Sequence, residues 1–247
     1  MDVGFLLVLV AVFLFAGFVK GVLGIGFPAI MIGSLTFFVD PREAIALAVI
    51  AMLATNLRQG FRGEPVINVI RRYWVYCVFS SVGIFIAAYM GASVSRAFLL
   101  IAAGIAMIIF GVTSLLVDMP KLSDRFDKFA QAVAGSLGAI MGGLTGIWGP
   151  PLAAYLATKR LDKNALVQAM GLIFLIQSIP LLLGLIATGE FSRQSGIIGT
   201  VMLIPVFMAL FAGERVRNRM NVQQFTRAFM IMFILLGLNL IRRGVLV

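Results

Sequence analysis

Histidine is absent from this chain, and cysteine occurs once, as Cys77 within an apolar run. The sequence therefore lacks the commonest protein metal ligand and the commonest acid–base group near neutral pH. A single cysteine excludes an internal disulfide framework and a thiolate metal cluster. No nucleophile–base pair is evident either. We expect a protein that binds no metal and no cofactor and that is not an enzyme.

Charged residues are also scarce, at 12% of the chain, whereas 61% of the residues are hydrophobic and the mean hydropathy is +1.06. A soluble domain cannot cover that much apolar surface with so few polar groups. In lipid, long apolar runs must satisfy their backbone internally, which favours helices. We predict an all-α polytopic membrane protein. Its N-terminal run follows Asp2 rather than a basic region, which favours a retained membrane segment over a signal peptide.

Charges and turn residues divide the chain into about ten apolar segments. They are residues 3–19, 24–39, 43–63, 73–90, 97–117, 127–141, 147–158, 164–187, 195–212 and 223–241. Several are shorter than the ~20 residues that a full span needs. Two of the short ones, 24–39 and 147–158, each follow a glycine-rich break, so the pairs 3–39 and 127–158 are either two spans each or re-entrant hairpins.

The net charge of +10 is explained without nucleic acid. If the segments alternate across a membrane, most Lys and Arg residues fall in the connections on one side. Such a bias marks the cytoplasmic side of a membrane protein. We therefore expect both termini outside the cytoplasm, a lipid bilayer as the surroundings, and no nucleic-acid partner.

The two halves of the chain align when the sequence is shifted by 122 residues. The shift places "GVLGIGFP", residues 21–28, over "GLTGIWGP", residues 143–150. Each half holds five segments, an odd number, so the second half enters the membrane from the opposite side. Inverted repeats with broken helices are typical of secondary transporters. We predict two repeats, residues 1–120 and 121–247, each opening with a glycine/proline-broken helix pair and together forming one transport unit.

Glycine and proline at these breaks predict that one helix ends and another begins. A helix with Pro28 or Pro150 in its first turn points free N–H groups at the break. Such an end carries partial positive charge and suits an anion. Two ends facing each other would form one anion site near the membrane midplane. The alternative is that the glycines only allow close helix packing.

Few polar residues lie near these breaks. Lys20 precedes the first break. Arg58 lies in the third segment, 43–63, and aligns with Pro180 well inside segment 164–187. For Arg58, snorkelling to the cytoplasmic interface is the alternative to a site role. Neutral polar residues occupy matching places in the halves, since Thr55 and Asn56 align with Gln177 and Ser178. They can hydrogen-bond an oxyanion or a neighbouring helix.

The stretches "KGVLGIGFPAI", "TNLRQGFRG" and "GGLTGIWGPPLAAYL" resemble the TauE/SafE sulfite-exporter family of bacterial membrane permeases. The resemblance implies transport of a small sulfur-containing anion such as sulfite, thiosulfate or sulfoacetate. Arg58 stands where many relatives have an aromatic residue. The predicted substrate-binding residues are Lys20, Gly21, Gly24, Gly26, Phe27, Pro28, Asn56, Arg58, Gln59, Thr145, Gly146, Trp148, Gly149, Pro150 and Gln177.

Together these patterns predict a secondary transporter in the bacterial inner membrane that exports such an anion by alternating access around a midplane site. A passive anion channel and an importer of a related oxyanion such as thiosulfate remain as alternatives. The sequence leaves a homodimer open.

Overall fold

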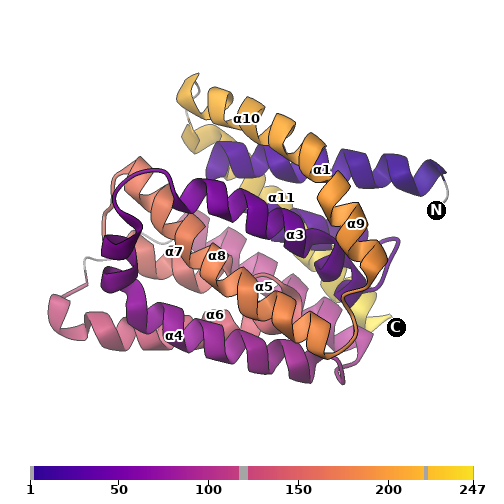
Figure 1. Ribbon diagram of the computed structural model, residues 1–247, viewed down its shortest axis with the longest axis horizontal. Helices are drawn as coiled ribbons and strands as arrows, with labels where there is room; N and C mark the ends of the chain where they lie inside the picture. Colours follow the sequence, from indigo (N-terminus) through magenta and orange to yellow (C-terminus); the bar gives the residue numbers. More distant parts are fainter. Residues whose placement is uncertain (1–2, 117–121, 220–221, 247) are drawn as a thin grey trace.

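A computed structural model describes residues 3–116, 122–219 and 222–246 of the chain. These residues form eleven α-helices and one short 3-10 helix, and they contain no strand (Figure 1). The helices are α1 (Val3–Leu23), α2 (Phe27–Leu35), α3 (Pro41–Gly60), α4 (Val66–Gly91), α5 (Arg96–Leu116), α6 (Asp127–Thr145), α7 (Gly149–Ala157), α8 (Lys163–Ala187), α9 (Arg193–Val201), α10 (Leu203–Arg219) and α11 (Val222–Val245). The predicted all-α fold is confirmed.

The distribution of side chains is that of a protein surrounded by lipid. Large apolar side chains such as Leu7, Phe79 and Ile204 are exposed on the outer faces of the helices. Polar side chains such as Asn56 and Gln177 are instead buried between helices. Four helices of the described chain are long and apolar enough to cross a membrane, and a fifth span is added if the bent pair α9–α10 counts as one. The chain is a multi-pass membrane protein.

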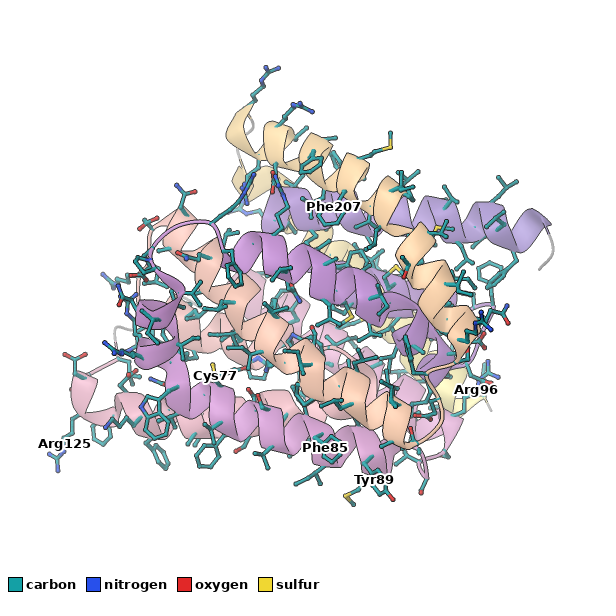
Figure 2. The ribbon with its side chains drawn as sticks, in the orientation of Figure 1. Cys77, Phe85, Tyr89, Arg96, Arg125 and Phe207 are labelled. Carbon is teal, nitrogen blue, oxygen red and sulfur yellow. The ribbon has the colours of Figure 1, made fainter. Side chains whose placement is uncertain are left out.

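The structure has two polar ends. Both termini lie at one end in Figure 1, where Arg96 pairs with Asp40 and Arg42 pairs with Glu190. Figure 2 shows Arg96 at this end and Arg125 at the opposite one. The opposite end, called the basic end below, contains the turn 61–65, the turn 158–162 and the C-terminal part of α10. It is the end that the charge bias assigns to the cytoplasm.

Segment boundaries differ from the predicted ones in several places. Helix α4 begins at Val66, before the predicted start at residue 73. The predicted segment 195–212 is divided into two helices, α9 and α10, which meet at Met202 with a bend of 40°. Pro205 has no N–H to donate to the Val201 carbonyl, so the helix cannot continue unbroken there. Both predicted breaks also lie later, because Lys20 and Gly21 are still in α1 and Gly143 is in α6. The end of predicted segment 97–117, the boundary between residues 120 and 121, and Asp2 lie outside the described residues.

The helices pack in pairs that correspond between the two halves. If α1 to α3 match α6 to α8, α4 matches α9–α10, and α5 matches α11, then the packed pair α1–α10 corresponds to the packed pair α4–α6. In the same way the packed pair α4–α8 corresponds to the packed pair α3–α9. In the pairs α3–α8 and α5–α11, each helix packs against its own match in the other half. This pattern is what a two-fold relation between the halves requires, and it supports the predicted inverted repeat.

The α5–α11 pair is reciprocal at atomic detail. A Cβ added to Gly104 would meet the Gly237 carbonyl oxygen at 2.5 Å, and one added to Gly237 would meet the Gly104 carbonyl oxygen at 2.6 Å. Gly111 faces Ile234 and the Met230 carbonyl, whereas Gly244 faces the matching residues Ile101 and Ala97. Small residues let helix backbones approach closely in membranes. Here they bring the two halves together along one line.

The first motif glycine, Gly21, has such a packing role. A Cβ added to Gly21 would lie 2.3 Å from the Leu210 carbonyl oxygen and 2.9 Å from the Gly213 Cα. Its repeat partner Gly143 packs in the same way against Ile84 and Ala87 of α4. For these two glycines the structure favours close helix packing over anion binding.

We predict that Gly21→Ala lowers the apparent Tm of the detergent-solubilised protein, because α1 and α10 must separate to admit the methyl group. Overpacking of this kind costs about 1–3 kcal/mol. The matched control is Gly149→Ala, since no atom lies within 4 Å of the added Cβ there. Thermal unfolding followed by tryptophan fluorescence measures both variants, and equal Tm values for the two would contradict the prediction.

Candidate functional site

The first break lies between α1 and α2. Gly24 and Gly26 have φ values of 79° and 97°, which residues with a side chain rarely adopt. The Gly24 N–H still donates to the Lys20 carbonyl at 2.7 Å, so α1 closes in a left-handed turn. Helix α2 then begins at Phe27, with Pro28 in its first turn. The predicted helix start at Pro28 is therefore found one residue earlier.

The second break repeats this geometry between α6 and α7. Gly146, with φ 71°, ends α6 and donates its N–H to the Gly142 carbonyl at 2.7 Å. The Thr145 hydroxyl accepts the Ile147 N–H at 3.2 Å, which satisfies a backbone group that the break has freed. Helix α7 begins at Gly149, followed by Pro150. Trp148 is almost completely buried inside the break.

Both breaks line one small cavity. Its volume is about 30 Å³, enough for a water-sized group. The first break contributes Ile25, Gly26 and Pro28, and the second contributes the repeat-matched residues Ile147, Trp148 and Pro150. The rest of the lining consists of Ala29, Gly149, Phe110 of α5 and Phe174 of α8. The N-terminal turns of α2 and α7 therefore meet at the same space, and their partial positive charges add there.

A buried lysine lies beside the first break. Lys20 is 2% exposed, and its ammonium group donates a hydrogen bond to the Asn56 Oδ1 atom. Among the described residues, no carboxylate forms an ion pair with it. An ammonium group buried with only a neutral partner is costly, and either a bound anion or loss of the proton relieves that cost.

Asn56 connects this lysine to the other half of the chain. Its Nδ2 atom donates to the Ser178 hydroxyl at 3.3 Å, and that hydroxyl donates to the Phe174 carbonyl at 2.6 Å. Asn56 and Ser178 are 122 residues apart, which is the repeat spacing. Matched residues of a two-fold structure touch only near its axis, so this contact supports a central position for the Lys20–Asn56 pair.

Buried amides without partners lie nearby. Neither amide atom of Gln59 or of Gln177 has a hydrogen-bond partner in the described part of the chain. The Tyr76 hydroxyl faces the Gln177 amide and lies against Gly138 beside the Trp148 carbonyl. It forms no hydrogen bond of regular geometry with the described residues. Such groups can bind a polar ligand or water, since unpaired buried polar atoms are costly.

Tyr76 was not among the predicted site residues, and its position depends on a break in α4. Tyr73 has non-helical backbone angles inside that helix. The Gln131 side chain of α6 fills the gap, accepting the Tyr76 N–H at 3.2 Å and donating to the Arg72 carbonyl at 3.0 Å. A side chain inserted into the helical hydrogen-bond ladder is a known cause of kinks. No glycine or proline marks this one in the sequence.

Arg58 lies apart from the cavity. Its guanidinium donates to Glu214 at 2.8 Å and stacks over the Phe211 ring with Cζ 4.2 Å from the centroid. It therefore joins α3 to α10 at the basic end. Apart from Gly21, the other predicted residues of the two motifs lie at the breaks. Lys20, Asn56 and Gln177 are buried between helices.

Comparison with known proteins gives a family match over nearly the whole chain. The family model described as sulfite exporter TauE/SafE matches residues 9–240. The resemblance inferred from the sequence motifs is thereby confirmed. No curated protein sequence and no solved structure matches the chain.

We predict that Lys20→Met weakens binding of sulfite by about tenfold or more, since a hydrogen bond to a charged group contributes about 1.5–3 kcal/mol. The same variant should unfold at an equal or higher temperature, because an apolar chain replaces an uncompensated buried charge. Equilibrium binding of radiolabelled sulfite in detergent measures the first effect. Lys128→Met, at an exposed position of the basic end, is the control, and unchanged affinity in Lys20→Met would remove Lys20 from the site.

Proposed function

The chain belongs to the TauE/SafE sulfite-exporter family, and on that basis we propose that it is a secondary transporter, not an enzyme, that exports a small sulfur-containing anion across the bacterial inner membrane. The cavity between the two breaks is its central site. Transport proceeds by alternating access around this site.

One observation carries the proposal most directly. The buried Lys20 ammonium has a neutral hydrogen-bond partner, Asn56, and no ion-pair partner in the described chain. The N-terminal turns of α2 and α7 line the adjacent cavity. The Lys20 ammonium group and the two helix ends are therefore three neighbouring sources of positive potential. No carboxylate of the described residues lines the cavity or pairs with Lys20, and an anion supplies the missing charge.

The substrate class follows from the family and from the donors present. Sulfite and organosulfonates such as sulfoacetate carry oxygen atoms on sulfur that accept several hydrogen bonds at once. The site offers backbone N–H groups at two helix ends, an ammonium group, and the amides of Asn56 and Gln177. The cavity of about 30 Å³ holds a water-sized group and excludes a large molecule.

Alternating access is supported by the relation between the halves. The reciprocal contacts of Gly104 with Gly237 and of Asn56 with Ser178 provide a line along which one repeat can move against the other. Inverted repeats around a midplane site are the common basis for such rocking. A site made from both repeats stays intact while access to it changes side.

Export is favoured by the energetics of the substrate charge. A membrane potential that is negative inside drives an anion outward by about 2.3 kcal/mol per charge per 100 mV. The buried polar side chains of the described residues include no Asp or Glu, so these residues offer no carboxylate relay for a coupling proton. We propose uncoupled export, with import of a related oxyanion such as thiosulfate as the alternative direction.

Counterflow in proteoliposomes tests the proposal. We predict that unlabelled sulfite or sulfoacetate on one side accelerates the flux of radiolabelled sulfite from the other, because a carrier returns faster when loaded. Valinomycin-imposed potentials measure the direction, and an inside-negative potential should accelerate efflux. Saturable flux that is lost in Lys20→Met and kept in Lys128→Met is expected. Flux without saturation or trans-stimulation would identify an anion channel instead, and no flux of any tested anion would overturn the proposal.

A further inference from the structure

A second cavity opens at the basic end, outside the central site. Its volume is about 290 Å³, and its lining includes Gln59 and Arg62 of α3 and the following turn, Asn164 and Val167 of α8, and Glu214 and Arg217 of α10. Three helices from both halves of the chain therefore meet around it. We call it the basic cavity.

The wall of the basic cavity is held in place by one side chain. Gln168 of α8 accepts the Glu64 N–H at 2.9 Å and donates to the Glu64 carbonyl at 2.7 Å. It thereby fixes the turn that carries Arg62 and Gly63 to the start of α8. A wall tied by two hydrogen bonds gives the cavity a defined shape at the end of the molecule.

Positive charge exceeds negative charge in the basic cavity. Among the described residues that line it, Glu214 is the one carboxylate, and it already pairs with Arg58 at 2.8 Å and with Arg62 at 3.3 Å. Arg217 lines the same space. The Arg62 side chain is 57% exposed, so it can turn from Glu214 toward an arriving anion at little cost.

The inner part of the basic cavity leads toward the central site. Gln59 is 3% exposed there, and both of its amide atoms lack a partner in the described chain. One helical turn earlier on α3, Asn56 holds Lys20. Val167, also in the lining, lies against Gly24 of the first break. The basic cavity and the central site are therefore neighbours along α3.

We propose that the basic cavity is an access subsite for a sulfonate-type or sulfite-type anion, which is attracted by Arg62 and Arg217 and then hydrogen-bonded by Gln59 before it reaches Lys20. Glu214 competes with the anion for the guanidinium groups and so lowers, without cancelling, the positive charge of the empty subsite. This inference rests on the proposed function, because it assigns an entrance to the same transport site.

Charge-selective labelling in nanodiscs tests the subsite without requiring transport. Asn164→Cys, in a Cys77→Ser background, places a thiol in the basic cavity, and Ser123→Cys places one at an exposed position of the same end. Each is labelled with methanethiosulfonate reagents that carry either a sulfonate or a trimethylammonium group. We expect Asn164→Cys to prefer the sulfonate reagent by about tenfold relative to Ser123→Cys, because a lined cavity focuses the field.

Two further measurements separate the possible results. Adding Arg62→Gln and Arg217→Gln should abolish the preference, and sulfoacetate should slow labelling of Asn164→Cys while leaving Ser123→Cys unchanged. Equal reagent preference at both positions, or no protection by sulfoacetate, overturns the subsite. If protection is absent while counterflow is intact, only the subsite fails. If protection is present while counterflow is absent, the subsite stands as an anion site and the transport function fails.

Discussion

The need to satisfy every polar group away from water governs this structure. A bilayer interior offers no hydrogen bonds, so backbone that leaves a helix must be enclosed by protein or line a cavity. Both breaks meet this condition in the same way. Gly24 and Gly146 close their helices with left-handed turns, the Thr145 hydroxyl takes a freed N–H, and the N-terminal turns of α2 and α7 line a common space. The proposed anion site therefore also encloses the backbone groups that the two breaks expose.

Close helix packing makes that enclosure possible. Gly21 and Gly143 let α1 and α6 approach α10 and α4 closely, and Gly104 and Gly237 do the same for α5 and α11. The scaffold that results holds the short helices α2 and α7, which could not stand in lipid alone at nine residues each. The glycines of the first motif therefore have different roles. Gly21 allows α1 to pack closely against α10, whereas Gly24 and Gly26 adopt the positive φ values of the break.

The sequence predicted the features that follow from local chemistry. Apolar length predicts the helices, and glycine with proline predicts both breaks to within a few residues. Contacts between distant segments were harder to predict. The kink at Tyr73 depends on Gln131, 55 residues from the Tyr76 N–H that it accepts, and nothing in the sequence near Tyr73 announces it. Arg58 was a site candidate because the repeat alignment matches it with Pro180 inside segment 164–187, but its partner Glu214 lies 156 residues away. Gly21 belongs to the motif by sequence. Its role in packing becomes visible only from the position of α10, whose backbone lies against it.

The two halves share a scaffold but differ in their chemistry. In the repeat alignment Lys20 corresponds to Gly142 and Gly26 corresponds to Trp148. In the second half the Trp148 ring lies against Gly142, whereas in the first half Lys20 is buried beside its break. One half therefore supplies a cation and the other an aromatic wall. The ammonium group and two helix ends of roughly half a positive charge each together provide roughly two positive charges. A second lysine in place of Gly142 would raise the total above the charge of even a doubly charged anion, and under the proposed function it would bind the anion too tightly for release. Under the proposed function, this difference between the two halves would let two similar scaffolds bind one small anion and release it.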